Sequence, residues 1–411
     1  MTARRDPVGQ RSETVRRANL SAIVRELHAR GPLSRSELVA RTGLTRSAIR
    51  GLIGELTASG LAGEEPAIPL GIPGRPSPLV RPEPERAVVL ALEIAVDSLA
   101  AALVGLGGSI LTTTRVDRPR DHRTLDAVVD DLVGLADRVL VPTRRREAVI
   151  GVGVGVAGVV RRTDGLVRMA PNLGWIDIPL GERLAAALGL AVPLEVTNEA
   201  DLGALAELRR GAARGVDHVI YLSGEVGVGG GIIVDGRPLT SVAGYGGEIG
   251  HIPINPAGAR CACGSIGCWE TEVGATALLR RAGRSTDGGR GAVDAVLHAA
   301  SAGDPLALAA LEETGRWVGV GLAGLVNVFN PRLVVFGGLF EHLYPYIEQP
   351  VRAVLDERAL RAPAELVDLV PSALGDDAPL LGAAELAFEP LLADPARWLR
   401  PRAALLERAS A

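Results

Sequence analysis

The spacing of hydrophobic residues changes near residue 82. Before that point apolar residues recur every three or four positions, which is the period of amphipathic helices. The first such stripe predicts a helix over residues 15–30, on Leu20, Ile23, Val24 and Leu27. After residue 87, short apolar runs alternate with helical stretches, as in α/β domains. Prolines between the two patterns indicate a domain boundary at residue 82.

Two more helices and a basic hairpin are predicted within the first segment. Ser34 and Glu37 form a capping box for the second helix, and Thr45 caps a third helix whose first turns are polar. A Gly-Arg-Pro turn at 74–76, between two short extended runs, predicts a wing. Such a winged helix-turn-helix, predicted over 15–81, places its third helix in the major groove of DNA. The candidate DNA-contacting residues are Arg35, Thr45, Arg46, Ser47, Arg50 and Arg75.

The charge distribution supports DNA binding by this segment. Residues 1–81 carry 13 Arg and 7 acidic residues, a net charge of +6, so the remainder carries −10 of the overall −4. A basic segment on an acidic body indicates a polyanionic partner for the front only. Residues 1–14 are expected to form a disordered basic arm that adds phosphate contacts. Taken singly, each arginine is also compatible with a solvated surface charge.

The acidic body is predicted to hold two lobes of one repeated design. The expected strands lie at 88–94, 99–106, 110–116, 148–156, 218–222, 232–234 and 333–336, and the expected helices at 125–140 and around 317–329. Strands that open onto glycine turns, followed by helices, predict two ribonuclease-H-like lobes with a cleft between them. Such turns can bind phosphate through backbone N–H groups. A tight turn between packed strands explains an isolated glycine equally well.

All three cysteines of the chain lie within eight residues. Cys261, Cys263 and Cys268 follow His251, and three thiols with one imidazole are the ligand set of a tetrahedral zinc site. The alternatives are three buried thiols, or one disulfide with a cysteine left over. Four protein ligands leave no open coordination position. The predicted Zn²⁺ is therefore structural and does not activate water.

The segment 247–270 closely resembles the zinc-binding signature of the ROK family (repressors, open reading frames and sugar kinases). It begins Gly-Glu-Ile-Gly-His and ends Cys-Ala-Cys-Gly-Ser-Ile-Gly-Cys-Trp-Glu. Shorter similar segments lie at 170–175, 197–201, 227–233 and 326–331, so the likeness covers about residues 87–390. Together with the winged helix, this resemblance implies the repressor branch of the family. It implies a DNA-binding domain followed by a two-lobed ribonuclease-H-like, actin-like ATPase fold over 82–411.

The resemblance also implies a sugar pocket against the zinc loop. Carried over by position, its sugar-facing residues are Asn172, Asn198, Glu199, Gly227, Glu248, His251 and Glu270. Carboxylates and amides suit sugars, whose hydroxyls present paired donors and acceptors. A metal-bound histidine also has a fixed tautomer for its second nitrogen. The alternative role of Glu248 and Glu270 is to support the zinc loop.

Two positions depart from the pattern of the family's kinases. Their general base is an Asp, and Glu199, one methylene longer, stands at that position here. A misplacement of about 1 Å can cost on the order of 100-fold in rate. Their Asp-x-Gly-x-Thr phosphate loop corresponds to residues 92–98, which have neither the glycine nor the hydroxyl at the expected places. We therefore expect no intact catalytic site.

These features together predict a sugar-responsive transcriptional regulator, a repressor of carbohydrate metabolism genes that is not an enzyme. The expected partners are operator DNA, a small sugar or sugar-phosphate effector and further copies of the chain, as a homodimer or dimer of dimers. No apolar run could span a membrane and no secretory leader is present, so a cytoplasmic protein is expected. The alternatives are an active sugar kinase with an added DNA-binding domain, and a DNA-binding protein whose body only dimerises.

Overall fold

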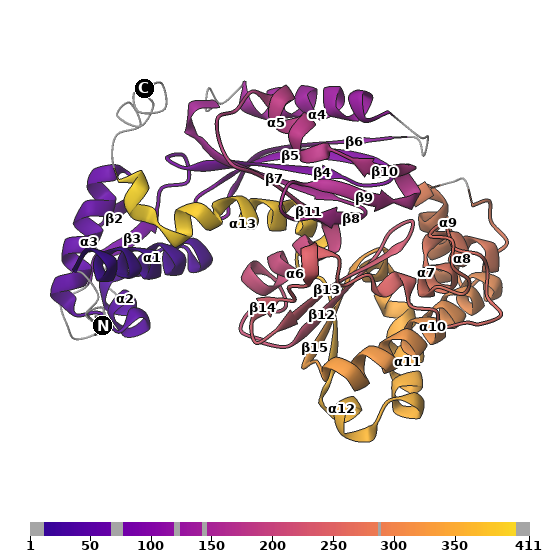
Figure 1. The fold of residues 1–411 in the computed structure, drawn as a ribbon. Coiled ribbons are helices and arrows are strands. Elements are labelled where there is room, and N and C mark those ends of the chain that lie inside the picture. Colours follow the sequence, from indigo (N-terminus) through magenta and orange to yellow (C-terminus); the bar gives the residue numbers. More distant parts are fainter. Residues whose placement is uncertain (1–11, 67–76, 119–123, 142–145, 287–288, 400–411) are drawn as a thin grey trace, which may run out of the picture.

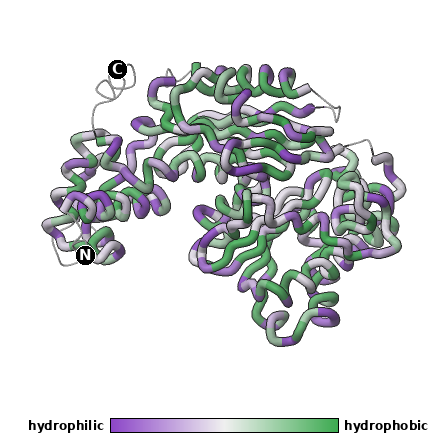
Figure 2. The backbone as a smooth tube through the Cα atoms, in the orientation of Figure 1, coloured by the Kyte–Doolittle hydropathy of each residue, from purple (hydrophilic) through white to green (hydrophobic). Residues whose placement is uncertain are grey.

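The computed structural model describes residues 12–66, 77–118, 124–141, 146–286 and 289–399. A small helical unit precedes two α/β lobes, and the last helix of the chain returns to the small unit (Figure 1). Hydrophobic stretches run through the interior of both lobes, whereas hydrophilic ones gather in surface turns (Figure 2). No helix in the described ranges is long and apolar enough to cross a membrane.

The small unit contains the three predicted helices and a three-stranded sheet. Its elements are α1 (Ser12–Arg30), β1 (Leu33–Ser34), α2 (Arg35–Thr42), α3 (Arg46–Ser59), β2 (Ala62–Glu65) and β3 (Leu79–Pro82), with β3 pairing antiparallel to both other strands. Both predicted caps are present. Ser34 and Glu37 exchange hydrogen bonds in a capping box, and the Thr45 hydroxyl accepts from the Ala48 N–H.

The first helix begins three residues earlier than predicted. Ser12–Thr14 were assigned to the disordered arm, but they form the first turn of α1. Glu13 pairs with Arg16 and Arg17 at helical spacing, and a carboxylate near a helix N-terminus is stabilising. The rest of the predicted arm and the predicted wing tip, with Arg75, lie outside the described residues.

The first lobe is built on a five-stranded sheet in the order β11-β7-β4-β5-β6. Its strands are β4 (Val88–Ile94), β5 (Ser98–Gly105), β6 (Ile110–Asp117), β7 (Val149–Val156) and β11 (Leu194–Asn198). Helices α4 (Leu125–Leu140) and α5 (Leu180–Leu188) cover one face. A small second sheet of β8 (Val159–Arg161), β9 (Leu166–Ala170) and β10 (Trp175–Ile178) leads toward the cleft, with η2 (Pro171–Leu173) between its last two strands.

The second lobe repeats this topology in the order β14-β13-β12-β15-β16. Its strands are β12 (Val219–Gly224), β13 (Val228–Val234), β14 (Arg237–Pro238), β15 (Leu333–Gly338) and β16 (Asp368–Pro371). One face is packed by α7 (Trp269–Val273), α8 (Ala275–Arg281), α9 (Gly289–Ser301), α10 (Pro305–Phe329) and α11 (Leu339–Arg358), with α12 (Arg361–Leu366) at the end. In each lobe, three antiparallel strands are followed by two strands that add in parallel beside the first. The predicted repeat is therefore confirmed.

Two helices connect the lobes. Helix α6 (Glu199–Arg210) follows β11 of the first lobe and packs on β12 and β13 of the second. Helix α13 (Ala378–Ala393) follows the second lobe and packs on β4 and β7 of the first. The two helices lie against each other between the sheets.

The small unit shares a hydrophobic core with the first lobe. Leu20, Ile23 and Leu27 of α1 belong to the same buried cluster as Phe388 and Leu391 of α13. The predicted boundary at residue 82 marks the end of β3, but it does not separate two independent cores.

Candidate functional site

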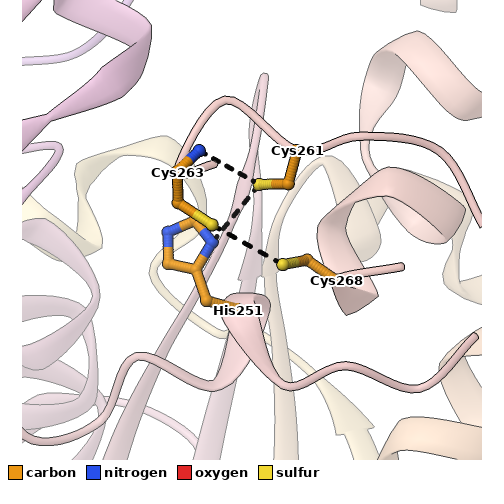
Figure 3. A group of neighbouring side chains, drawn as sticks. All are labelled: His251, Cys261, Cys263 and Cys268. Carbon is orange, nitrogen blue, oxygen red and sulfur yellow. Dashed lines mark hydrogen bonds between the residues drawn. The ribbon is translucent and has the colours of Figure 1, made fainter. Parts of the chain in front are cut away.

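The four predicted metal ligands come together beside the cleft. Ile249–His251 forms a short 3-10 turn (η4), and the following loop returns so that Cys268 precedes α7. Gly267, at a φ of +70°, allows this return, because a Cβ there would lie 1.7 Å from the Asn255 carbonyl oxygen. The side chains of His251 and the three cysteines point toward one another (Figure 3).

Their spacing suits a tetrahedral ion. All four ligand atoms lie within 4.8 Å of one another. The Cys261 Sγ to His251 Nδ1 distance is 3.6 Å, and Cys263 Sγ to Cys268 Sγ is 3.7 Å. Tetrahedral bonds of about 2.0–2.3 Å to Zn²⁺ give ligand separations of roughly 3.5–3.8 Å. No disulfide joins the three cysteines. The cluster could therefore hold a metal ion through His251 Nδ1 and three thiolates.

Glu270, the second residue of α7, links this cluster to the cleft. Its Oε1 accepts a hydrogen bond from Cys261 Sγ at 2.9 Å and lies 3.5 Å from His251 Nδ1. Its Oε2 faces Gly227, where a Cβ would lie 2.6 Å from that oxygen and 3.1 Å from Asn172 Nδ2. Because Asn172 belongs to the first lobe, side chains of the two lobes approach each other here, at a glycine without a Cβ that would obstruct them.

Glu248 and Asp201 are two buried carboxyl groups near the same region. Burial raises the pKa of Glu248 to about 7, with contributions from Asp201 and Glu270. Burial also raises the pKa of Asp201 to about 6. Asp201 lies on the first turn of α6, and a Cβ on Gly247 would be 3.8 Å from its Oδ1. A carboxyl group whose pKa lies near 7 is partly protonated at neutral pH. In its protonated form it can both donate and accept hydrogen bonds, as sugar hydroxyls do.

Asn198 and Glu199 stand at the N-terminus of α6. The Asn198 Oδ1 accepts from the N–H groups of Ala200 and Asp201, and its Nδ2 donates to the Gly158 carbonyl at 3.0 Å. Asn198 is thus the cap of this helix, and its contact with a sugar stays a prediction. Burial, followed by Glu225 and Glu93, holds the pKa of Glu199 well above its usual range.

A second cavity, of about 270 Å³, lies past the glycine turn between β12 and β13. Asp97, Glu225 and Asp376 contribute carboxylates to its lining, and Arg290 pairs with two of them, Asp376 at 2.7 Å and Glu225 at 3.5 Å. Burial raises the pKa of Glu225 to about 7, with Asp97 among the neighbours that raise it further. The cavity is therefore rich in carboxylates, and the guanidinium that lines it is already engaged.

The candidate DNA-contacting residues are distributed over α2 and α3. Arg46, Ser47 and Arg50 are exposed on the first turns of α3. The hydroxyl of Thr45 is used as the helix cap. The guanidinium of Arg35 forms two hydrogen bonds to Glu64, at 2.6 and 2.7 Å. Three of these side chains are therefore exposed, and the other two form hydrogen bonds within the protein.

Sequence reasoning missed four charged residues of the cleft. Asp201 lies inside a segment that the family resemblance had drawn attention to, two residues from Glu199, and Glu225 lies two residues before another such segment, which begins at Gly227. Their carboxylates could have been proposed from that proximity. Arg290 and Asp376 lie far from both in the chain, and no local pattern marks them.

Two lobes of this repeated topology, with a metal-ligand loop at the cleft, define a sugar-kinase-like α/β protein. The chain belongs to the ROK family, whose model matches residues 89–389. A xylose repressor from Bacillus spizizenii is 27% identical over 380 residues, which cover 92% of this chain and 97% of that protein. A glucokinase from Streptomyces coelicolor is 32% identical over 320 residues, which cover 74% of this chain and 98% of that protein.

A solved structure extends this similarity to the small unit. The crystal structure of a ROK family transcriptional regulator, a homologue of the E. coli Mlc protein, has a TM-score of 0.72 at 26% identity. The match covers 94% of this chain and 97% of that one. It therefore reaches beyond the part of the chain that the glucokinase matches.

Proposed function

We propose that this protein is a sugar-responsive transcriptional regulator, acting as a repressor, that binds DNA through residues 12–82. The observation that carries this proposal is that three helices and a hairpin, in winged helix-turn-helix order, share one chain and one core with the ROK body. Relatives that match over the whole chain include a xylose repressor and a regulator structure. The likeness therefore supports the combination of domains as well as each part.

The exposed face of α3 supports DNA binding. Arg46 and Arg50 project from the N-terminal turns of the helix that a winged helix-turn-helix lays into the major groove. Arginine reads guanine edges with two hydrogen bonds, and both side chains are exposed for that purpose. A pair of such domains reads two half-sites, so we also propose a homodimer or dimer of dimers.

The cleft beside the metal loop is the proposed sugar site. Asn172 from one lobe and Gly227, Glu248 and Glu270 from the other surround it. Binding of Zn²⁺ through His251 Nδ1 leaves Nε2 directed away from the ion and available to a sugar hydroxyl. The ion's contribution is structural, since four protein ligands fill a tetrahedral shell.

The second cavity supports a non-catalytic body. A nucleotide triphosphate needs cations and backbone N–H groups around its phosphates. Here Asp97 and Glu225 occupy the turns that follow β4 and β12, where a phosphate would lie. Arg290 is already paired with Glu225 and Asp376. We infer that ATP is excluded from this cavity.

The proposal is tested first on DNA. Duplexes that bind the full-length protein are selected from a random-sequence pool and their affinity is measured by fluorescence anisotropy. Arg46→Ala and Arg50→Ala should each weaken binding by about 1–3 kcal/mol, whereas Arg361→Ala, an exposed arginine on the second lobe, should leave it unchanged. Equal affinity in all four proteins would contradict the placement of the DNA-reading helix.

An active sugar kinase is the second candidate function. The observation that favours it is the carboxylate of Glu199 at the head of α6, together with the similarity to a glucokinase. A coupled ATP-turnover assay over hexoses, pentoses and amino sugars separates the two candidates. Sustained turnover with any of these sugars would contradict the regulator without catalysis, and we expect none.

A further inference from the structure

Helix α6 runs from the proposed sugar site to the small N-terminal unit. Its first turn carries Asp201, a charged neighbour of Glu248 at the proposed sugar site, and Glu199, a neighbour of Glu225 at the second cavity. Its last residue, Arg210, reaches α1 of the small unit. Twelve residues at about 1.5 Å each make this helix about 18 Å long. One rigid element therefore has an end at each of the two proposed binding regions.

Arg210 ends in a buried polar cluster formed by three separate helices. Its guanidinium donates to the carboxylate of Glu385 on α13 and to the main-chain oxygen of His28 on α1. His28 Nε2 lies 3.2 Å from Glu385 Oε1. His28 is 2% exposed and Glu385 5% exposed, so the cluster is shielded from solvent. Breaking such a buried charged network by removing one partner is costly, which makes the cluster act as a unit.

The turn between β5 and β6 completes this cluster. The Gly107 N–H donates to His28 Nδ1 at 3.0 Å, and His28 Nε2 lies 2.8 Å from Arg210 Nη2 and 3.2 Å from Glu385 Oε1. The Gly107 carbonyl accepts from Arg210 at 2.9 Å. A Cβ on Gly108 would lie 2.0 Å from the guanidinium carbon, so only glycine lets Arg210 approach this closely. Although burial alone would raise it, His28 and Arg210 hold the pKa of Glu385 below its usual range.

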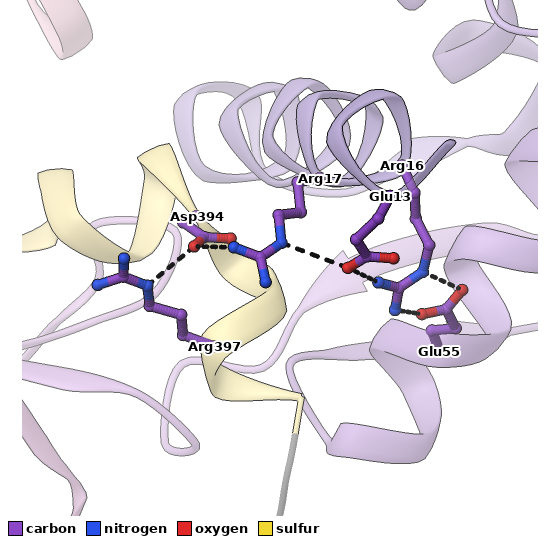
Figure 4. Close-up of polar contacts among 6 residues, drawn as sticks. All are labelled: Glu13, Arg16, Arg17, Glu55, Asp394 and Arg397. Carbon is purple, nitrogen blue, oxygen red and sulfur yellow. Dashed lines mark hydrogen bonds and ion pairs between the residues drawn. The ribbon is translucent and has the colours of Figure 1, made fainter. Parts of the chain in front are cut away.

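Helix α1 is also fixed to α13 outside this cluster. Ser21 donates to the Leu392 carbonyl, and Arg25 pairs with Glu389. Arg17 reaches Asp394 just past the end of α13 at 3.3 Å, a contact drawn in Figure 4. Within the small unit, Arg16 pairs with Glu55 of α3 in the same view. A displacement of α13 or α6 is therefore passed to α1 and from α1 to the helix that carries Arg46.

We propose that the cluster of Arg210, Glu385 and His28, referred to below as the junction cluster, couples sugar binding to DNA binding. This inference rests on the proposed function. Both α6 and α13 cross from one lobe to the other, so any rotation of the lobes about the cleft moves the two helices against each other. The junction cluster is where both helices hold α1. Lobe closure on a sugar therefore repositions the small unit of the protein.

The coupling has a thermodynamic requirement. A sugar changes DNA affinity only if it binds one lobe arrangement better than the other, and operator DNA must then change sugar affinity by the same factor. Loss of the junction cluster should reduce this factor toward one without removing either binding site, because none of its residues lies in the cleft or on α3.

The experiment compares operator affinity with and without saturating D-xylose, and separately D-glucose, in full-length proteins. Allosteric couplings are typically about 5- to 150-fold. We expect the unmodified protein to show a change in this range with one sugar, and Arg210→Met and Glu385→Gln to change less than about 3-fold. Glu385→Gln keeps the size of the side chain and serves if Arg210→Met does not fold. Sugar affinity without DNA, and DNA affinity without sugar, should stay close to those of the unmodified protein.

Arg25→Met is the matched control. Its ion pair with Glu389 joins the same two helices, α1 and α13, but does not touch α6. We expect this variant to keep the full sugar response. If operator affinity in Arg210→Met and Glu385→Gln responds to sugar as fully as in the unmodified protein, the junction cluster is not the coupling element. The proposed function is not affected by that result. No response in the unmodified protein to any sugar that binds it would overturn both.

Discussion

The two polar regions that adjoin the hairpin of β12 and β13 differ in the side chains that they bring together. At the metal end, Glu270 approaches Gly227 beside Asn172 and also contacts two of the metal-ligand side chains, Cys261 and His251. At the other end, Glu225 stands in the glycine turn itself and is paired with Arg290. Gly227 and Glu225 of one turn thus belong to two different regions. Gly227 adjoins the polar side chains beside the metal ligands, and Glu225 lines the cavity that is rich in carboxylates.

Under the proposed function, this difference separates the half of a sugar-kinase-like fold that the chain uses from the half that it does not use. A kinase needs both ends, one for the sugar and one for the triphosphate. A sensor needs the sugar end and a route from that end to its output, which α6 provides by beginning in the cleft and ending at α1. The comparison with a glucokinase and with a repressor, at 32% and 27% identity, is consistent with either use of the fold. The distinction therefore rests on single residues.

The largest predicted effect is the loss of zinc, and with it of sugar binding, when one metal ligand is replaced. Cys263→Ser should abolish stoichiometric zinc, and with it the sugar-induced shift in melting temperature, because the loop that positions Glu270 is held by the four ligands. Zinc is measured by mass spectrometry of the purified protein. Ser265→Ala, in the same loop but not a ligand, should keep both zinc and the sugar response. Retained zinc in Cys263→Ser would refute the ligand assignment.

A smaller effect is expected from the sugar-facing carboxylate. At pH 8, above the pKa of about 7 of Glu248, Glu248→Gln should weaken binding of the effector sugar by about 10- to 100-fold, because hydrogen bonds to charged groups contribute about 1.5–3 kcal/mol. Binding is measured by calorimetry, and zinc content should not change. Glu182→Gln, an exposed carboxylate on α5, is the control. Unaltered sugar affinity would assign Glu248 to support of the loop instead.

The opposite end of the cleft should respond to pH. Glu225 has a folded-state pKa of about 7, above its usual value of about 4.3, so the folded protein holds a proton that the unfolded chain has lost. The stability from this protonation is complete below the usual pKa and is lost as pH rises through 7. Glu225→Gln should therefore stabilise the protein at pH 8 by about 1–2 kcal/mol and give a smaller gain at pH 5.5.

Urea unfolding at the two pH values measures this difference. The lost ion pair with Arg290 offsets little of the gain, because that arginine is partly exposed. The variant should also gain no ATP turnover, since Asp97 and Asp376 remain. A variant that is less stable than the unmodified protein at pH 8 would contradict the assignment of Glu225 as a buried carboxyl group whose ionised form destabilises the fold.

Local patterns predicted most of the elements and the metal ligands. The capping box at Ser34 and the cysteine cluster each consist of residues that are close together in the chain, so a local pattern is enough to predict them. The apolar runs likewise gave β4 and α4 with their observed bounds. What depends on distant parts of the chain was not predictable. His28 gave no signal as a residue of the amphipathic helix α1, because its partners Arg210 and Glu385 are 182 and 357 residues away.

The same reason limits what a motif can say about single site residues. Asn198 was predicted from its position in a motif, but its side chain is engaged by the first turn of α6, a local use that its place before a helix could have indicated. Arg35 is predicted as a DNA contact, which stays a prediction, and in the structure it pairs with Glu64 of β2. The charge of an arginine does not by itself show whether its side chain contacts DNA or an acidic side chain of the same protein.

The most direct test of the central claim is a single titration of operator affinity against sugar concentration in the absence of ATP. The unmodified protein, a selected DNA duplex and a panel that includes D-xylose and D-glucose are sufficient. We predict that at least one sugar changes the dissociation constant for DNA by about 5-fold or more, without nucleotide. An operator affinity that no sugar changes, or that changes only when ATP is present and consumed, would contradict a sugar-sensing regulator built on a non-catalytic kinase fold.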